Sequence, residues 1–172
     1  MTHSPLLTEF KNLFNIQGKP ILDLACGNGR NGLYLHQQGY PVTFADKNKL
    51  ALDTLQAENL LKIEQCIHVD FETEKPVLTV NSAQAILVFR YLHRPLIAQI
   101  KEAIEPGGLI IYETFTTENR QFGRPNRAEF LLQANELKEM FSGWHCLHYF
   151  EGIKHDPDRA IAQIVCQKPK SI

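Results

Sequence analysis

The chain has 172 residues, of which 44% are hydrophobic and 22% charged, with 18 Lys and Arg against 19 Asp and Glu. These values are typical of one soluble globular domain over residues 1–172 and exclude a disordered chain. No apolar run approaches the ~18 residues of a membrane span, and a net charge of −1 gives no basic field for nucleic acid. We therefore expect neither a membrane nor a nucleic-acid partner.

The cysteines and the amino terminus favour a reducing compartment. Cys26, Cys66, Cys146 and Cys166 lie far apart without a C-x-x-C pair, which is typical of reduced thiols rather than of disulfides or a zinc site. Residues 1–7 lack a basic stretch followed by an apolar one, so they do not resemble a signal peptide. We expect a cytoplasmic monomer or homodimer and no bound metal.

Short apolar runs alternate with helical patterns along the chain. Five strands are predicted at residues 20–25, 41–46, 65–70, 84–89 and 109–114. Helices are predicted at residues 30–38, 48–62 and 96–105. Beyond them the sequence predicts a long loop, a helix, and two strands joined by a short turn, at residues 116–127, 131–141, 144–151 and 160–167.

This order predicts an α/β fold with a doubly wound, Rossmann-like sheet of seven strands. The sheet should be parallel except for a C-terminal antiparallel hairpin strand, because a short turn cannot return a parallel strand. A ligand should bind beyond the carboxyl ends of the strands, near the switch in strand order. Residues 1–19 have an amphipathic pattern that fits either a lid helix over this ligand or packing in the core.

The strongest local signal is the segment LDLACGNGRNG at residues 22–32. Gly27, Gly29 and Gly32 form G-x-G-x-x-G between a strand and a helix, where the backbone can approach a ligand closely. Asp46 ends the next strand about 20 residues further on, where a carboxylate can hold ribose hydroxyls. On these residues alone, an NAD-dependent oxidoreductase is an open alternative.

Two further acids favour a ligand without phosphate. Asp23 precedes the glycines, where a carboxylate would repel a diphosphate but can hold an ammonium or sulfonium group. Asp70 ends the third strand and is followed by Phe71, a pair that suits the amine and the ring of adenine. A ligand with adenine, ribose and a cationic amino-acid tail is S-adenosylmethionine, which is therefore the predicted cofactor.

The sequence resembles the class I S-adenosylmethionine-dependent methyltransferases. The matching segments are LDLACGNG, FADKN, HVDFE and IEPGGLIIYE, at residues 22–29, 44–48, 68–72 and 104–113. Two longer segments are similar to the tellurite-resistance (TehB-like) methyltransferases, at residues 29–48 and 135–152. The resemblance implies an enzyme that uses S-adenosylmethionine and releases S-adenosylhomocysteine.

The resemblance also implies which residues bind the cofactor. Asp23 and the turn after it would contact the methionine and ribose part, Asp46 and Lys47 the ribose hydroxyls, and Asp70 with Phe71 the adenine. The predicted set is Asp23, Ala25, Cys26, Gly27, Asn28, Gly29, Asn31, Asp46, Lys47, Asp70, Phe71 and Phe89. Other roles are open for single members, such as a helix cap for Asp46 or core packing for Phe71.

The methyl group in this fold points toward the ends of the fourth and fifth strands. Arginines interleaved with aromatic residues there suit a small anionic or aromatic acceptor. The predicted substrate-binding residues are Arg90, Tyr112, Arg124 and Arg159, and the candidate catalytic residues are Tyr91, His93 and His155. TehB-like proteins carry an adjacent histidine and arginine near their end, whereas here the pair is spread over HDPDR at residues 155–159.

The predicted function is methyl transfer to a small-molecule acceptor. A soft anion of the tellurite, selenite or thiol type is one class of acceptor, because such nucleophiles need no general base. The alternatives are the oxidoreductase named above and a catalytically weak cofactor-binding module that serves a protein or RNA partner.

Overall fold

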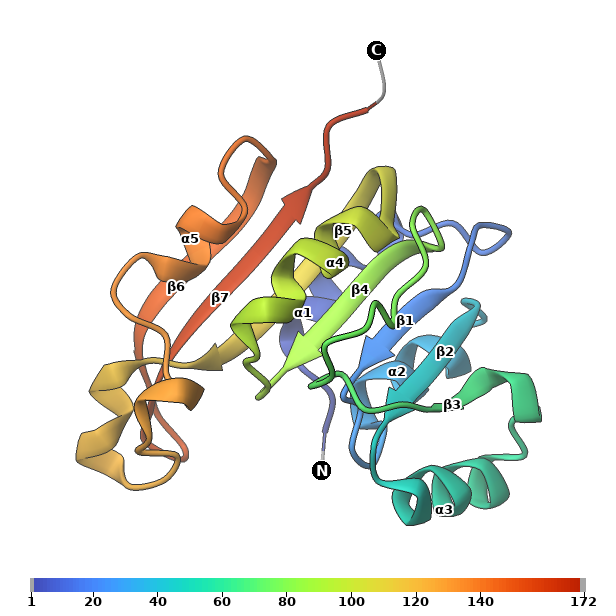
Figure 1. Cartoon of the computed structure of the whole chain (residues 1–172), viewed down its shortest axis with the longest axis horizontal. Helices are drawn as coiled ribbons and strands as arrows, with labels where there is room; N and C mark the ends of the chain where they lie inside the picture. Colours follow the sequence, from blue (N-terminus) through green and yellow to red (C-terminus); the bar gives the residue numbers. More distant parts are fainter. Residues whose placement is uncertain (1, 171–172) are drawn as a thin grey trace.

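The computed structural model describes residues 2–170 and contains one seven-stranded sheet in the order β3-β2-β1-β4-β5-β7-β6 (Figure 1). Its strands are β1 (Ile21–Leu24), β2 (Val42–Asp46), β3 (Cys66–His68), β4 (Ala83–Phe89), β5 (Ile104–Phe115), β6 (His145–Lys154) and β7 (Arg159–Gln167). Strands β1 to β5 pair in parallel, and β7 pairs antiparallel with both β5 and β6. The predicted doubly wound sheet with its antiparallel C-terminal hairpin is confirmed.

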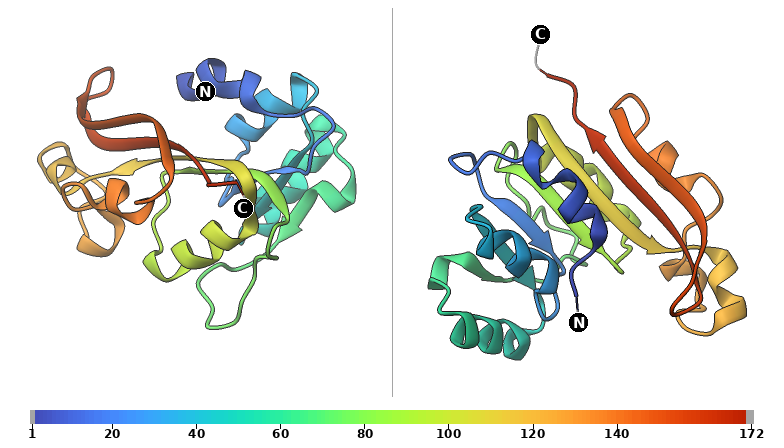
Figure 2. Two further views of the ribbon diagram at one scale, coloured as in Figure 1. Left: turned by 90° about the horizontal axis from the view of Figure 1, so that it is seen from above. Right: turned by 180° about the vertical axis from the view of Figure 1, so that it is seen from behind.

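Alternating residues of the strands fill two apolar cores, one on each face of the sheet. In β4, Ile86 and Val88 belong to the first core and Ala85 and Leu87 to the second, as expected for strands covered on both faces. The first face is covered by α4 (Ile97–Ala103) and α5 (Glu136–Met140), and the second by α1 (Pro5–Phe10), α2 (Arg30–Gln37) and α3 (Lys49–Asn59) (Figure 2). No helix among residues 2–170 has both the length and the apolarity needed to cross a membrane.

Five short 3-10 helices complete the described chain, and one of them corrects a prediction. They are η1 (Lys11–Leu13), η2 (Ile63–Gln65), η3 (Arg94–Leu96), η4 (Thr117–Phe122) and η5 (Ala128–Phe130). The prediction of a long loop at residues 116–127 was wrong for its first half, because Thr117–Phe122 form η4. The buried Asn119 anchors this helix to β7, because its Oδ1 accepts a hydrogen bond from the Ala160 N–H at 2.9 Å.

The helix predicted at 131–141 was also wrong in extent, since α5 covers only five residues. The backbone of Leu132 is extended and bonds the end of β5 instead: its N–H donates to the Phe115 carbonyl, and its carbonyl accepts from the Thr117 N–H, both at 2.9 Å. Asn135 then adopts a left-handed conformation (φ 64°) before the helix begins. The spacing of apolar residues predicted a helix here because Leu131 and Leu132 are both buried, although they belong to this extended link.

The other helix ends differ by a few residues. Helix α3 stops at Asn59 because Leu60 is left-handed (φ 53°), and α4 stops at Ala103. Strand β5 begins at Ile104 rather than near residue 109, so it includes the Pro-Gly-Gly segment.

Residues 2–10 pack against the amino end of α2 and the second core. Leu6 and Leu7 are buried in that core. Asn31 accepts a hydrogen bond from the Ser4 N–H at 2.8 Å, and the Arg30 guanidinium donates to the Thr2 carbonyl at 2.6 Å. Core packing is therefore what the structure shows for α1, and residue 1 of the segment predicted at 1–19 lies outside the described residues.

Candidate active site

The glycine turn connects β1 to α2 and is packed against the strands beneath it. Gly29 is left-handed (φ 76°), and a Cβ there would lie 2.8 Å from the Leu55 side chain. A Cβ on Gly32 would lie 2.5 Å from the Phe44 ring and 2.7 Å from the Asp23 carboxylate. Glycine at these positions therefore lets α2 begin close to the sheet, while the close approach of a ligand that the pattern predicted stays a prediction.

Substituting Gly32→Ala should destabilise the protein. Both groups that the new methyl would meet are buried and rigid, so the free energy of unfolding should fall by about 1–3 kcal/mol, as measured by urea denaturation. Gly152→Ala on the edge strand β6 is the control, because its Cβ would approach nothing closer than 3.3 Å. Equal stabilities of the two variants would contradict the tight packing of the turn.

Asp46 at the end of β2 holds the turn in place. Its two carboxylate oxygens accept hydrogen bonds from the Gly27 and Asn48 N–H groups, each at 2.8 Å. The cap of α3 is Asn48, which accepts from the Ala51 N–H, so the helix-cap alternative for Asp46 is wrong. Each carboxylate oxygen has a second lone pair, which leaves Asp46 able to accept further hydrogen bonds from a ligand.

Asp23 lies beneath the turn and is only 3% exposed. Its Oδ2 accepts a hydrogen bond from the Gly32 N–H at 2.9 Å. Burial raises the pKa of Asp23 to about 7, against the effect of that hydrogen bond and the nearby Arg30. Asp23 is therefore a buried group that supports the turn, and it does not line the main pocket.

A pocket of about 450 Å³, here called the main pocket, lies beyond the carboxyl ends of β2, β1, β4 and β5. Seven residues of the predicted site line it: Ala25, Asp46, Lys47, Asp70, Phe71, Arg90 and Tyr91. The structure thus brings together side chains from four strand ends. It also adds residues that sequence reasoning did not assign to the site, namely Glu72, Leu92, Thr114, Phe115, Pro125 and Phe130.

One end of the main pocket is acidic. Asp70 accepts a hydrogen bond from the Glu72 N–H at 2.9 Å through Oδ1, which leaves its other oxygen free of this bond. Glu72 lies 3.7 Å from the Lys47 ammonium and 4.0 Å from Nδ1 of His93. Phe71 is part of the first core, so core packing is present, and it also lines the pocket, where contact with adenine stays a prediction.

Tyr91 follows β4 at the centre of the main pocket. Burial, reinforced by the neighbouring carboxylates of Glu72 and Asp70, raises the pKa of its phenol well above the ordinary value. The backbone beside it is fixed, because the buried Tyr112 donates its hydroxyl to the Tyr91 carbonyl at 2.7 Å. Tyr91 therefore keeps its proton at neutral pH, and Tyr112 supports this segment from the core.

Several predicted cofactor residues do not line the main pocket. Cys26 and Phe89 pack against the second core, and burial raises the pKa of the Cys26 thiol. Asn31 holds Ser4, and Asn28 faces a shallow pocket beside α3. Gly27 contributes its N–H to Asp46. These residues therefore take part in packing and hydrogen bonding around the turn instead.

Five predicted residues on the acceptor side also lie outside the main pocket: His93, Tyr112, Arg124, His155 and Arg159. His155 is exposed in the turn between β6 and β7, where its Nδ1 lies 2.6 Å from Asp158. Arg124 is exposed, and only the following Pro125 reaches the pocket lining. Among residues 2–170, no group of three or more His, Cys, Asp or Glu side chains is placed to hold a metal ion.

A second pocket of about 410 Å³, here called the cationic pocket, adjoins the first at Arg90. The amino-terminal segment and the β6–β7 hairpin lie on the same face of the sheet around it (Figure 2). Its charged lining consists of four cations and two carboxylates: Arg30, Arg90, Lys154, Arg159, Glu9 and Glu113. Its formal charge is therefore opposite in sign to that of the main pocket, which has Asp46, Asp70 and Glu72 against Lys47 and Arg90.

Arg90 occupies the junction of the two pockets. It has a left-handed backbone (φ 56°), and its N–H donates to the Glu113 carbonyl at 2.8 Å. Its guanidinium carbon lies 6.0 Å from the ring of Phe115. The buried Glu113 carboxylate accepts a hydrogen bond from Gln163 at 2.5 Å. The predicted substrate residue Arg159 also lines the cationic pocket, while its guanidinium donates to the Pro157 carbonyl at 2.9 Å.

Sequence reasoning missed His148, Arg30 and Lys154 in this lining. Nε2 of His148 forms a hydrogen bond with Oε1 of Gln163 at 3.0 Å. The sequence did not indicate their shared position, because the pocket forms only where the hairpin meets the amino-terminal segment. The hairpin was predicted, but not its position against α1 and α2.

Solved structures with a similar fold include S-adenosylmethionine-dependent methyltransferases. One from Methanosarcina mazei is 14% identical with a TM-score of 0.75, covering 99% of this chain and 100% of that chain. TehB from Haemophilus influenzae is 24% identical with a TM-score of 0.73, covering 96% of this chain and 62% of that chain. At these identities the likeness defines the fold alone, which is the Rossmann-like fold of methyltransferases.

The sequence then gives the family. The family model described as "Tellurite resistance protein TehB" matches residues 1–164. The "Probable S-adenosyl-L-methionine-dependent methyltransferase TehB" of Haemophilus influenzae is 32% identical over 142 residues, which is 77% of this chain and 48% of that protein. The chain therefore belongs to the TehB family, as its resemblance predicted.

A further relative has a less specific description. The "Uncharacterized methyltransferase YodH" of Bacillus subtilis is 28% identical over 139 residues, covering 76% of this chain and 54% of that protein. The chain spans about half the length of the curated relatives it matches.

Proposed function

We propose that this protein is an S-adenosylmethionine-dependent methyltransferase with a small-molecule acceptor, and that the main pocket is its cofactor site. The observation that carries the proposal is the convergence of Asp46, Asp70 and Phe71 on one pocket beside the glycine turn. Membership of the TehB family, in which relatives are described as methyltransferases, supports it.

The residues present fit this cofactor. Asp46 retains lone pairs for ribose hydroxyls, and Asp70 has a carboxylate oxygen available for an adenine amine beside the ring of Phe71. Asp23, once it has lost its proton, can supply negative charge under the turn for an ammonium group. Three carboxylates against two cations in the pocket lining oppose a diphosphate, which disfavours NAD. When bound, S-adenosylmethionine supplies a methyl group on a positively charged sulfur.

The chain's own task in such a reaction is alignment. Methyl transfer needs the acceptor in line with the methyl group, and positioning can contribute roughly 7–11 kcal/mol. Arg90 at the junction can orient an anionic group, and Arg159 and Lys154 add positive charge on its far side. Tyr91 remains protonated and can donate a hydrogen bond, while the buried hydroxyl of Tyr112 keeps its backbone fixed.

These charges favour a small anionic acceptor. Tellurite, selenite and thiolates all carry the required negative charge and are soft nucleophiles that need no proton acceptor. Arg90 and Arg159 are the residues proposed to hold the acceptor, because both line the cationic pocket.

Calorimetric titration tests the cofactor assignment. S-adenosylhomocysteine should bind with a micromolar or lower dissociation constant, whereas NAD should not bind measurably. Absence of S-adenosylhomocysteine binding would refute the proposed function. Binding without turnover over a panel of tellurite, selenite and small thiols would instead support a cofactor-binding module.

A further inference from the structure

We propose that the acceptor is an organic anion with an apolar body, rather than a bare inorganic oxyanion. This inference rests on the methyltransferase function proposed above and concerns the acceptor of that same site. It follows from the presence of Arg90 in the same pocket lining as three carbon-rich side chains, Phe115, Pro125 and Phe130, here called the apolar wall.

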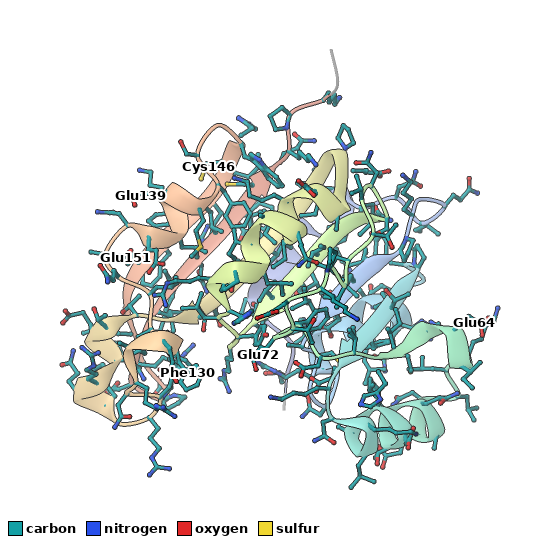
Figure 3. The ribbon with its side chains drawn as sticks, viewed as in Figure 1. Glu64, Glu72, Phe130, Glu139, Cys146 and Glu151 are labelled. Atoms are coloured by element: carbon teal, nitrogen blue, oxygen red, sulfur yellow. The ribbon has the colours of Figure 1, made fainter. Side chains whose placement is uncertain are left out.

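The apolar wall lies at the end of the main pocket opposite the cofactor-binding acids. Along the sheet edge the strands run β2, β1, β4, β5, so the ends that carry Asp46 and Phe115 are three strand spacings apart, about 14 Å. Figure 3 shows Glu72 below the carboxyl end of β4, with Phe130 farther along toward η4 and η5. The wall is therefore beyond the residues that suit ribose and adenine.

The side chains of the wall offer carbon surface and few hydrogen-bond donors. Phe130 is 39% exposed, and the ring of Phe115 lies 6.0 Å from the Arg90 guanidinium carbon. A hydrated oxyanion would lose water at this wall without gaining donors from it. A ring or branched chain would bury apolar surface against Phe115 and Phe130, while its anionic group paired with Arg90.

The charges of the two pockets support the same arrangement. The main pocket has one more carboxylate than cations, which opposes a free inorganic anion. The cationic pocket has two more cations than carboxylates and begins at Arg90. An acceptor whose anionic group faces the cationic pocket and whose body lies on the apolar wall satisfies both environments.

The apolar wall cannot take a proton from the acceptor. The side chains of Phe115, Pro125 and Phe130 contain no proton acceptor, and the Tyr91 phenol keeps its own proton. A thiol loses its proton near neutral pH and a carboxylic acid below it, whereas an alcohol does not. The acceptor is thus assigned to the thiols and carboxylic acids.

An acceptor panel with defined parts tests the assignment. 4-Mercaptobenzoate has an anionic group, an aromatic body and a thiol; thiophenol lacks the carboxylate, 3-mercaptopropionate lacks the ring, and tellurite lacks carbon altogether. Release of S-adenosylhomocysteine should give a kcat/KM for 4-mercaptobenzoate at least ten-fold above each of the others. Turnover of tellurite at a kcat/KM equal to or higher than that of 4-mercaptobenzoate would overturn the inference.

A pair of phenylalanine variants tests the wall itself. Phe130→Ala should raise the KM for 4-mercaptobenzoate at least ten-fold and leave that for 3-mercaptopropionate within two-fold. Phe122→Ala is a matched control, because Phe122 is 36% exposed in the same segment and does not line the pocket. Equal KM values in the two variants would overturn the inference.

Calorimetry separates this result from the proposed function. S-adenosylhomocysteine should bind both variants and the unsubstituted protein alike. Its failure to bind the unsubstituted protein would refute the methyltransferase function itself, whereas normal binding with no preference for 4-mercaptobenzoate would refute only the acceptor class.

Discussion

Asp46→Ala is expected to weaken the binding of S-adenosylhomocysteine about 100-fold, which corresponds to about 3 kcal/mol. The substitution removes the proposed acceptor of the ribose hydroxyls and also both hydrogen bonds that hold Gly27 and Asn48. Each lost bond to a charged group contributes about 1.5–3 kcal/mol. Calorimetric titration at neutral pH measures the change.

Asp53→Ala provides the control for this prediction. Asp53 is an exposed carboxylate on α3 that pairs with Lys49, so its loss removes the same charge without touching the turn. It should leave the affinity within about two-fold, as expected of a surface ion pair worth less than about 1 kcal/mol. If Asp46→Ala lowered the free energy of unfolding but left affinity unchanged, its role would be structural only.

The second large effect concerns Asp23 and pH. Because burial raises the pKa of Asp23 to about 7, its carboxylate becomes charged between pH 6 and pH 8. Affinity for S-adenosylhomocysteine, which carries an ammonium group, should therefore rise about ten-fold over this interval. 5′-Methylthioadenosine lacks the amino-acid tail and should bind equally at both pH values. A rise of equal size for both ligands would exclude Asp23 as the cause.

Ligand-free stability should change in the opposite direction over a lower pH range. The pKa of Asp23 is about 7 in the folded protein and 3.8 without burial, so the folded state holds a proton that the unfolded state has lost. The free energy of unfolding should therefore fall by about 1 kcal/mol per pH unit between about pH 5 and pH 7. Asp23→Asn should remove this contribution, as urea denaturation at pH 5 and pH 7 would measure. Parallel pH profiles of both proteins would contradict the raised pKa.

The position of the acids beside the glycine turn was largely predictable from sequence because it depends on local signals. A strand that ends in Asp23, a glycine turn and a strand that ends in Asp46 follow one another along the chain. Parallel strands place their carboxyl ends at one edge, so Asp46 and Asp70 had to lie near the turn. The fold was predictable for the same reason, since apolar runs and helical patterns alternate with little interruption.

The acceptor side was predictable only in part because its signals are not local. Asn119 and Leu132 form hydrogen bonds to strands far away in the sequence, and neither bond leaves a periodic pattern. Phe130 and Lys154 belong to irregular or edge segments whose position depends on tertiary packing. Arg90 was predicted on the substrate side, yet its place between two pockets of opposite charge follows only from the folded arrangement.

The hydrogen bonds between residues 2–4 and the start of α2 also have a consequence for folding. The acidic end of the main pocket is lined by residues that all lie within one continuous stretch of chain, residues 25–72. The cationic pocket joins the amino-terminal segment to residues 148–163, contacts that span most of the sequence. Closing so long a loop is slow and entropically costly. A partly folded chain would therefore form the acidic end of the main pocket early and the cationic pocket last.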